Sequence, residues 1–172
     1  MTRVFDSGEY RVYVNGDIMV FKPSNASARV LILTPPGIKP QFYSLLAVLL
    51  AKSGIESIIP KSPLPCNEHG LRNLVTRLIN NHKPNLVVAL GFNVDYVYGP
   101  RLTIGFDESA GTMQLLGSQV PGSIYMVSDQ CGQVGRALVN ADFVIKGALT
   151  LDSIIKIRDL ILSSIPLDVS KE

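Results

Sequence analysis

The sequence predicts an α/β protein of three layers, with a mostly parallel sheet, helices on both faces and an N-terminal β-hairpin. Hydrophobic residues make up 47% of the 172 residues and charged residues only 17%. Many segments are therefore expected to be buried on both sides, as in a sheet between helices. Short apolar runs alternate with segments of 3.6-residue apolar period, which is typical of βαβ units. Asn15-Gly16, between two alternating runs, predicts the hairpin.

The first half of the chain shows these elements most clearly. The hairpin is expected over residues 9–22, followed by a buried strand over 29–34 that ends in the stop signal Pro-Pro-Gly at 35–37. A helix is expected over about 41–53, because a proline stands at its start and a glycine just past its end. Residues 55–60 give the next strand.

The second half continues the alternation, and the whole chain, 1–172, is expected to form one domain. The βα units span 29–165, and 166–172 form a loose tail. The further elements that the pattern predicts are a helix over about 71–79, strands at 85–90 and 101–106, a short helical segment near 111–117, a strand at 123–128, a helix near 131–140, a strand at 142–145 and a helix over 151–164.

Charge and hydropathy exclude two classes of partner. The formal net charge is +2 and no segment concentrates Lys and Arg, so no nucleic-acid partner is expected. The longest apolar stretch, 45–51, is too short to cross a bilayer, so no membrane association is expected. The N-terminal residues form no apolar signal segment, and we expect a cytoplasmic protein.

The scarce Cys and His residues indicate no metal and no cofactor. Cys66 and Cys131 lie far apart in the sequence, and two free thiols are expected in a cytosolic protein of this size. His69 follows Glu68, but with Cys66 this group has no recognised metal-ligand spacing.

Polar and small residues gather where the predicted strands end. In open α/β sheets, ligands bind beyond the carboxyl ends of the strands. Gly37, Gly91, Asp107 and Gly132 are therefore candidate ligand-binding residues. The segments at these ends are 34–37, 61–70, 91–95, 107–111, 128–132 and 146–150.

Two long stretches carry a resemblance to a known family. RVLILTPPGIKPQFYSLLAVLLAKSGIESIIP, after the hairpin, resembles the α/β-hydrolase segment from the oxyanion-loop strand through the first helix to the next strand. SIYMVSDQCGQVGRALVNADFVIKGALTLDSIIKIRDLIL is similar to the C-terminal part of that family, where an acidic residue follows a strand. The resemblance implies a small member of the fold without a lid insertion.

The resemblance also implies where catalytic residues would stand. The family motif is G-x-S-x-G, followed in the chain by an acid and then a His. GFNVD at 91–95 places Asn93 at the nucleophile position, and DESAG at 107–111 offers Ser109. Asp129 is the candidate acid, although Ser109 and Asp129 are better explained as residues of helix caps or turns. No His follows Asp129, so the usual triad is absent.

Three functions remain open. The first is a non-catalytic α/β-hydrolase-like domain that binds a small molecule or a protein partner. The second is a Rossmann-like enzyme for nucleotides or sugar phosphates, suggested by the glycine-bearing turn 128–135, whose helix start could hold a phosphate. The third is an assembly subunit, a homo-oligomer for example, which pairs through an open edge of the hairpin.

Overall fold

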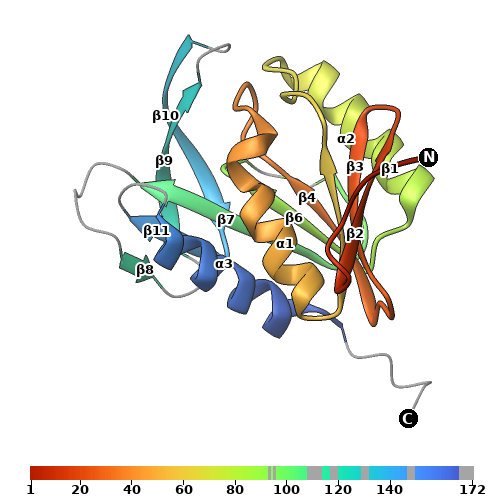
Figure 1. Cartoon of the computed structure of the whole chain (residues 1–172). Helices are drawn as coiled ribbons and strands as arrows, with labels where there is room; N and C mark the ends of the chain where they lie inside the picture. Colours follow the sequence, from red (N-terminus) through yellow and green to blue (C-terminus); the bar gives the residue numbers. More distant parts are fainter. Residues whose placement is uncertain are drawn as a thin grey trace.

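The computed structural model describes residues 1–92, 94, 96–107, 114–116, 120–128, 132–146 and 150–166. Its main feature is a nine-stranded sheet in the order β1-β2-β3-β5-β4-β6-β7-β11-β8 (Figure 1). These strands are β1 (Thr2–Asp6), β2 (Tyr10–Asn15), β3 (Ile18–Pro23), β4 (Ala28–Leu33), β5 (Ile55–Pro60), β6 (Leu86–Leu90), β7 (Arg101–Asp107), β8 (Gln114–Leu116) and β11 (Phe143–Lys146).

The sheet is mixed, and the prediction of a mostly parallel sheet is wrong. The five strands β5, β4, β6, β7 and β11 run parallel through its centre, giving four parallel pairings. The four other pairings are antiparallel, three through β1, β2 and β3 and one through β8. The difference arises because the hairpin joins the same sheet and carries an extra strand, β1.

The hairpin forms where the sequence predicts it. Asn15 lies opposite Ile18, so Gly16 and Asp17 make a two-residue turn, and Gly16 adopts the left-handed φ of 62° that such a turn requires. Within the sheet, strand β2 of the hairpin pairs with β1, and strand β3 of the hairpin pairs with β5. The hairpin is therefore not the open edge of the sheet that the assembly hypothesis assumed.

Hydrophobic cores lie on the two faces of the sheet. On β4, Val30 and Ile32 belong to one core and Leu31 and Leu33 to the other, as the alternation of a strand requires. Helix α1 (Ser44–Lys52), which follows the short 3₁₀ helix η1 (Pro40–Tyr43), and helix α3 (Leu151–Ser164) pack on the first core. Helix α2 (Glu68–His82) packs on the second (Figure 1). We call these the α1/α3 face and the α2 face.

Side-chain caps start two of the helices. The Asn67 Oδ1 accepts a hydrogen bond from the Gly70 N–H at 2.6 Å at the start of α2. Thr150 and Ser153 form a reciprocal capping box at the start of α3. No helix in the described part of the chain is both long and apolar enough to cross a bilayer.

Two predicted helices are wrong. The segment near 131–140 is strand β10 (Gly132–Ala141), which pairs antiparallel with β9 (Val120–Ser128) in a separate two-stranded sheet. The segment near 111–117 contains strand β8 rather than a helix in its described residues. Glycines at 132 and 135 weaken a helix, and pairing with a neighbouring strand overrides the local pattern.

Candidate functional site

The carboxyl ends of the five central strands meet at one edge of the sheet, because these strands are parallel neighbours. We call it the carboxyl edge. Thr34 follows β4 directly and is fully buried. Its Oγ1 has no hydrogen-bond partner among the described residues. A buried hydroxyl is normally paired, so an unpaired one at a strand end indicates a site for a ligand or a water.

Two of the predicted ligand residues shape the same edge. Gly37 has a φ of 76° and donates its N–H to the Leu64 carbonyl at 3.0 Å, which joins the loops after β4 and β5. Gly91 has a φ of 85° and donates its N–H to the Ile104 carbonyl at 2.8 Å, which joins the end of β6 to β7. Both turns need the left-handed backbone that glycine adopts freely.

The connections leave this edge on opposite faces. After β4 the chain turns to the α1/α3 face, where Ile38 and Tyr43 join the core of α1 and α3. After β5 and β6 it turns to the α2 face, where Leu64 and Phe92 join the core of α2. Open α/β sheets bind ligands beyond the strand ends at a point where the connections diverge in this way. Thr34 lies at this point.

Of the other predicted site residues, two lie in described strands and three lie outside the described residues. Asp107 ends β7 opposite Lys146 of β11, so its backbone lies at the carboxyl edge. Gly132 opens strand β10, not a helix, so the phosphate-binding helix start expected there is not formed. Asn93, Ser109 and Asp129 lie outside the described residues.

Among the described residues, neither histidine ring bonds to a serine or a carboxylate. His82 ends α2 beside the start of β4, where its carbonyl accepts a hydrogen bond from Arg29. Since α2 has 15 residues, His82 is about 20 Å from the carboxyl edge. His69, in the first turn of α2, is exposed, and its Nε2 lies 3.2 Å from the Asn73 amide nitrogen. The chain has no other histidine.

Tyr96, in the loop after β6, is a polar group that the sequence did not indicate. The Arg72 guanidinium lies over its ring, 4.6 Å from the centroid, which places it beside the first turns of α2. Its hydroxyl is buried and has no partner in the described part of the chain. Desolvation raises the pKa of Tyr96, and the nearby Arg72 charge partly opposes this shift.

The expectation of free thiols is wrong for Cys66. This residue is disulfide-bonded and lies in the loop between β5 and α2. The only other cysteine of the chain is Cys131, which lies outside the described residues. No group of three His, Cys, Asp or Glu side chains that could hold a metal occurs within the described ranges.

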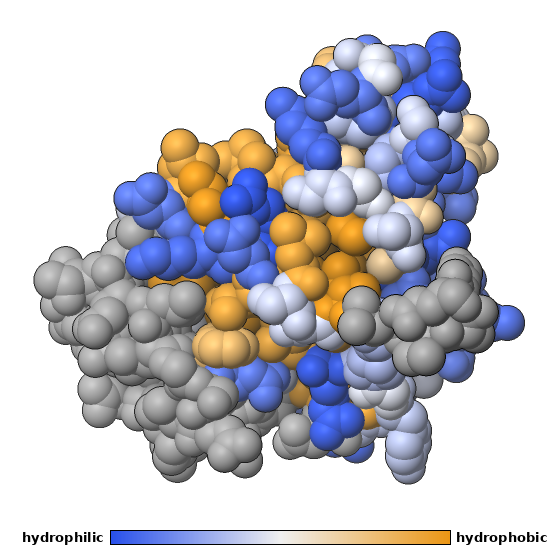
Figure 2. Space-filling model, turned by 90° about the horizontal axis from the view of Figure 1, so that it is seen from below, coloured by the Kyte–Doolittle hydropathy of each residue, from blue (hydrophilic) through white to orange (hydrophobic). Residues whose placement is uncertain are grey.

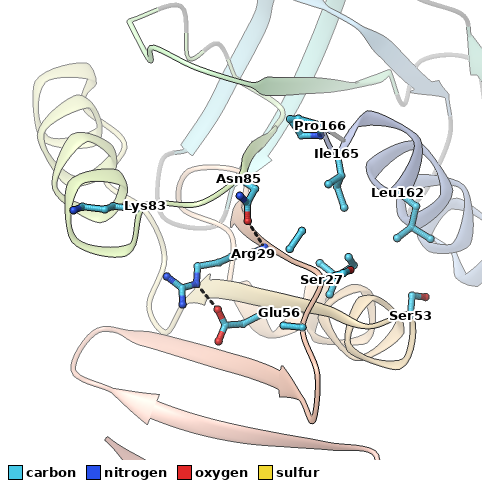
Figure 3. Close-up of a pocket in the computed structure, with 12 residues that line it drawn as sticks. Ser27, Arg29, Ser53, Glu56, Lys83, Asn85, Leu162, Ile165 and Pro166 are labelled. Atoms are coloured by element: carbon cyan, nitrogen blue, oxygen red, sulfur yellow. Dashed lines mark hydrogen bonds and ion pairs between the residues drawn. The ribbon is translucent and has the colours of Figure 1, made fainter. Parts of the chain in front are cut away.

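A cavity of about 610 Å³ lies at the opposite, amino edge of the sheet (Figure 3). The end of α3 forms its apolar wall, and the first residues of β4 and β5 form its polar side. Its lining includes Ser27, Arg29, Glu56, Asn85, Leu162 and Ile165.

Most polar groups that line this cavity already have hydrogen-bond partners within the protein. Arg29 pairs with the buried carboxylate of Glu56, and its Nη1 donates to the His82 carbonyl at 2.7 Å. Asn85 and Arg29 form two hydrogen bonds, both 2.8 Å long (Figure 3). The Arg29 backbone N–H donates to the Asn85 Oδ1, and the Asn85 backbone N–H donates to the Arg29 carbonyl. The Ser53 hydroxyl donates to the Leu49 carbonyl. These bonds hold the starts of the strands together, so we assign the cavity a structural role.

The fold and its carboxyl edge define an α/β protein with a mixed sheet. No family model matches the chain, and no curated protein matches it. Among solved structures it is similar to TT1662 from Thermus thermophilus, with a TM-score of 0.41 and 11% identity. The match covers 87% of this chain and 66% of that one. A similarity this weak carries no argument about function.

Proposed function

We propose that the chain is a ligand-binding domain of α/β-hydrolase-like type, without a Ser-His-acid triad, whose site lies at the end of β4. The observation that supports this most directly is the buried, unpartnered hydroxyl of Thr34. Leaving such a group unpaired costs a folded protein about 1–3 kcal/mol. A ligand that hydrogen-bonds to it would recover that free energy.

The surroundings favour a small, uncharged ligand with one hydroxyl or carbonyl group. Thr34 is flanked by the buried residues Pro35, Pro36 and Gly37, and Phe92 is buried after the neighbouring strand. One hydrogen-bonding group among apolar walls fixes the orientation of a ligand without requiring charge. Gly91 and the Asp107 backbone lie at this edge. Under this proposal they supply further polar contacts to the ligand, together with the predicted site residues Asn93, Ser109 and Asp129.

The placement of the histidines supports the non-catalytic part of the proposal. A serine hydroxyl becomes a nucleophile only beside a positioned base. His82 lies at the other edge, and His69 points its ring at Asn73 on the surface of α2. Asn93, at the nucleophile position of the family motif, has an amide in place of a hydroxyl.

A thermal-shift screen tests the binding site. The probes are small uncharged alcohols, ketones and amides at millimolar concentration. We expect at least one to stabilise the wild type and to lose this effect in Thr34→Val, which keeps the side-chain shape. Ser57→Ala is the matched control, because the Ser57 hydroxyl is also buried and unpartnered among the described residues but lies within β5. Equal stabilisation of wild type and Thr34→Val would refute the site.

Catalysis needs its own assay. A panel of short-chain esters is offered to the wild type and to Ser109→Ala. We expect neither protein to raise the rate above the buffer blank. Robust hydrolysis that disappears in Ser109→Ala would overturn the non-catalytic proposal while leaving the binding site intact.

The nucleotide hypothesis has lost the feature that suggested it, since Gly132 begins strand β10 and not a helix. The same thermal-shift screen includes nucleotides and sugar phosphates as a separate arm. Stabilisation by these phosphates, unchanged in Thr34→Val, would favour that alternative over our proposal.

A further inference from the structure

Large apolar side chains lie exposed on helices η1, α1 and α3. Phe42 is 62% exposed, Leu45 43%, Leu151 58% and Leu162 36%. The helices α1 and α3 lie next to each other on the same face of the sheet (Figure 1). Figure 2, which views the molecule from below the last turns of these helices, shows apolar side chains gathered between polar ones. We call the exposed side of η1, α1 and α3 the apolar surface.

The sequence of each helix continues this surface along its length. On α1, Leu45 and Leu49 are four residues apart and so lie on one side of the helix. On α3, Leu151, Ile155 and Leu162 lie along one side over three turns, with the half-buried Arg158 between Ile155 and Leu162. A solvent-facing helix side normally carries mostly charged and polar residues, and one on which large apolar residues predominate indicates an interaction surface.

We propose that a second copy of this chain covers the apolar surface, with α1 of one copy against α3 of the other. Exposed charges of opposite sign on the two helices support this arrangement. The η1–α1 side carries Lys39 and Lys52, both exposed, and no acid between them. The exposed charges of α3 are the acids Asp152 and Asp159, while its two bases are half-buried. In a two-fold dimer the lysines of one copy meet the aspartates of the other.

The described ion pairs leave these charges available. None of them involves Lys39, Lys52 or Asp152, and Asp159 pairs only with its neighbour Arg158 at 2.9 Å. The acids also argue against an anionic lipid surface as the occupant, because such a surface repels them. In a two-fold dimer the lysines and the aspartates of each copy both face opposite charges, since each copy carries both groups.

Sedimentation equilibrium between about 1 and 200 μM tests the proposal. We expect the wild type to dimerise and Leu45→Glu to weaken the dimer at least tenfold. Tyr98→Glu is the control, because Tyr98 is 98% exposed in a loop that packs on the α2 face. A wild type that stays monomeric overturns the proposal, and so does an equal loss in Tyr98→Glu. Far-UV circular dichroism checks that each variant is folded.

A charge exchange tests which helices meet. The variant with Lys39→Glu and Lys52→Glu is acidic on both helices, and the variant with Asp152→Lys and Asp159→Lys is basic on both. Each is expected to dimerise at least tenfold more weakly than the wild type, and their mixture is expected to form a heterodimer. No gain on mixing would overturn the α1-to-α3 arrangement. A monomer that instead binds anionic phospholipid vesicles would overturn the second copy as occupant.

Discussion

Arg29, near the start of β4, forms an ion pair with the buried carboxylate of Glu56 on the neighbouring strand β5. The same guanidinium donates from Nη1 to the carbonyl of His82, the last residue of α2, at 2.7 Å. One side chain therefore joins two parallel strands to the end of α2, the helix that leads from β5 to β6. The carbonyls at the end of a helix carry partial negative charge, which a guanidinium complements.

Replacing Arg29 with Met should destabilise the fold strongly. The substitution keeps an apolar stem but leaves Glu56, whose side chain is only 7% exposed, without its counter-charge. Removing one partner of a buried pair costs about 3–5 kcal/mol, and we expect about 2–4 here because the Arg29 side chain is 44% exposed. Urea denaturation measures the change.

A double substitution is the control for this pair. Removing both charges with Arg29→Met and Glu56→Met should recover much of the loss, because no unpaired charge stays buried. If the double variant is as unstable as Arg29→Met, the bond to the His82 carbonyl contributes more than the ion pair does.

Gly70→Ala should weaken the start of α2. A Cβ at position 70 would lie 2.8 Å from the Asn67 Oδ1, which is the cap of this helix. The cap is worth about 1 kcal/mol, so Gly70→Ala and Asn67→Ala should each lower the free energy of unfolding by about that amount. Because both changes remove the same bond, the double variant should fall short of the sum, as measured by denaturation.

The central fold could be predicted because local pattern determines it. The strands β4, β5 and β6 are short apolar runs buried along nearly their whole length, and α3 spans the residues that its apolar period indicates. Strand β10 could not be predicted in the same way. Its residues also fit a helical spacing, and what makes them a strand is pairing with β9, which depends on contacts between separate segments.

The sequence predicts where in the fold the candidate site lies, but not all of the residues that form it. The order of strands and helices indicates the carboxyl edge, and the structure places Gly37, Gly91 and the Asp107 backbone there. Thr34 and Tyr96 were missed, because burial without a hydrogen-bond partner is a property of packing and not of sequence. One signal was present: a threonine that directly follows the apolar run 30–33 stands where an open sheet binds its ligands.

Cys66→Ser should remove a covalent stabilisation of the loop between β5 and α2. A disulfide contributes about 2–4 kcal/mol in proteins of this kind, mainly by restricting the unfolded chain. We expect dithiothreitol to lower the melting temperature of the wild type but not that of Cys66→Ser. A wild type that is insensitive to the reductant, with two titratable thiols, would contradict the bond.

Tyr96 should make the protein lose stability at alkaline pH. Desolvation raises the pKa of Tyr96 in the folded state above its ordinary value of about 10. Between these two pKa values the unfolded chain releases the proton and the folded chain keeps it, so the free energy of unfolding falls as the pH rises above about 10. Tyr96→Phe should reduce this fall.

The chain has six tyrosines and no tryptophan, so absorbance at 295 nm should show a tyrosine that ionises late and is missing in Tyr96→Phe. Arg72→Met should delay it further, because the Arg72 charge favours the phenolate. An unchanged titration in both variants would place the Tyr96 hydroxyl in solvent.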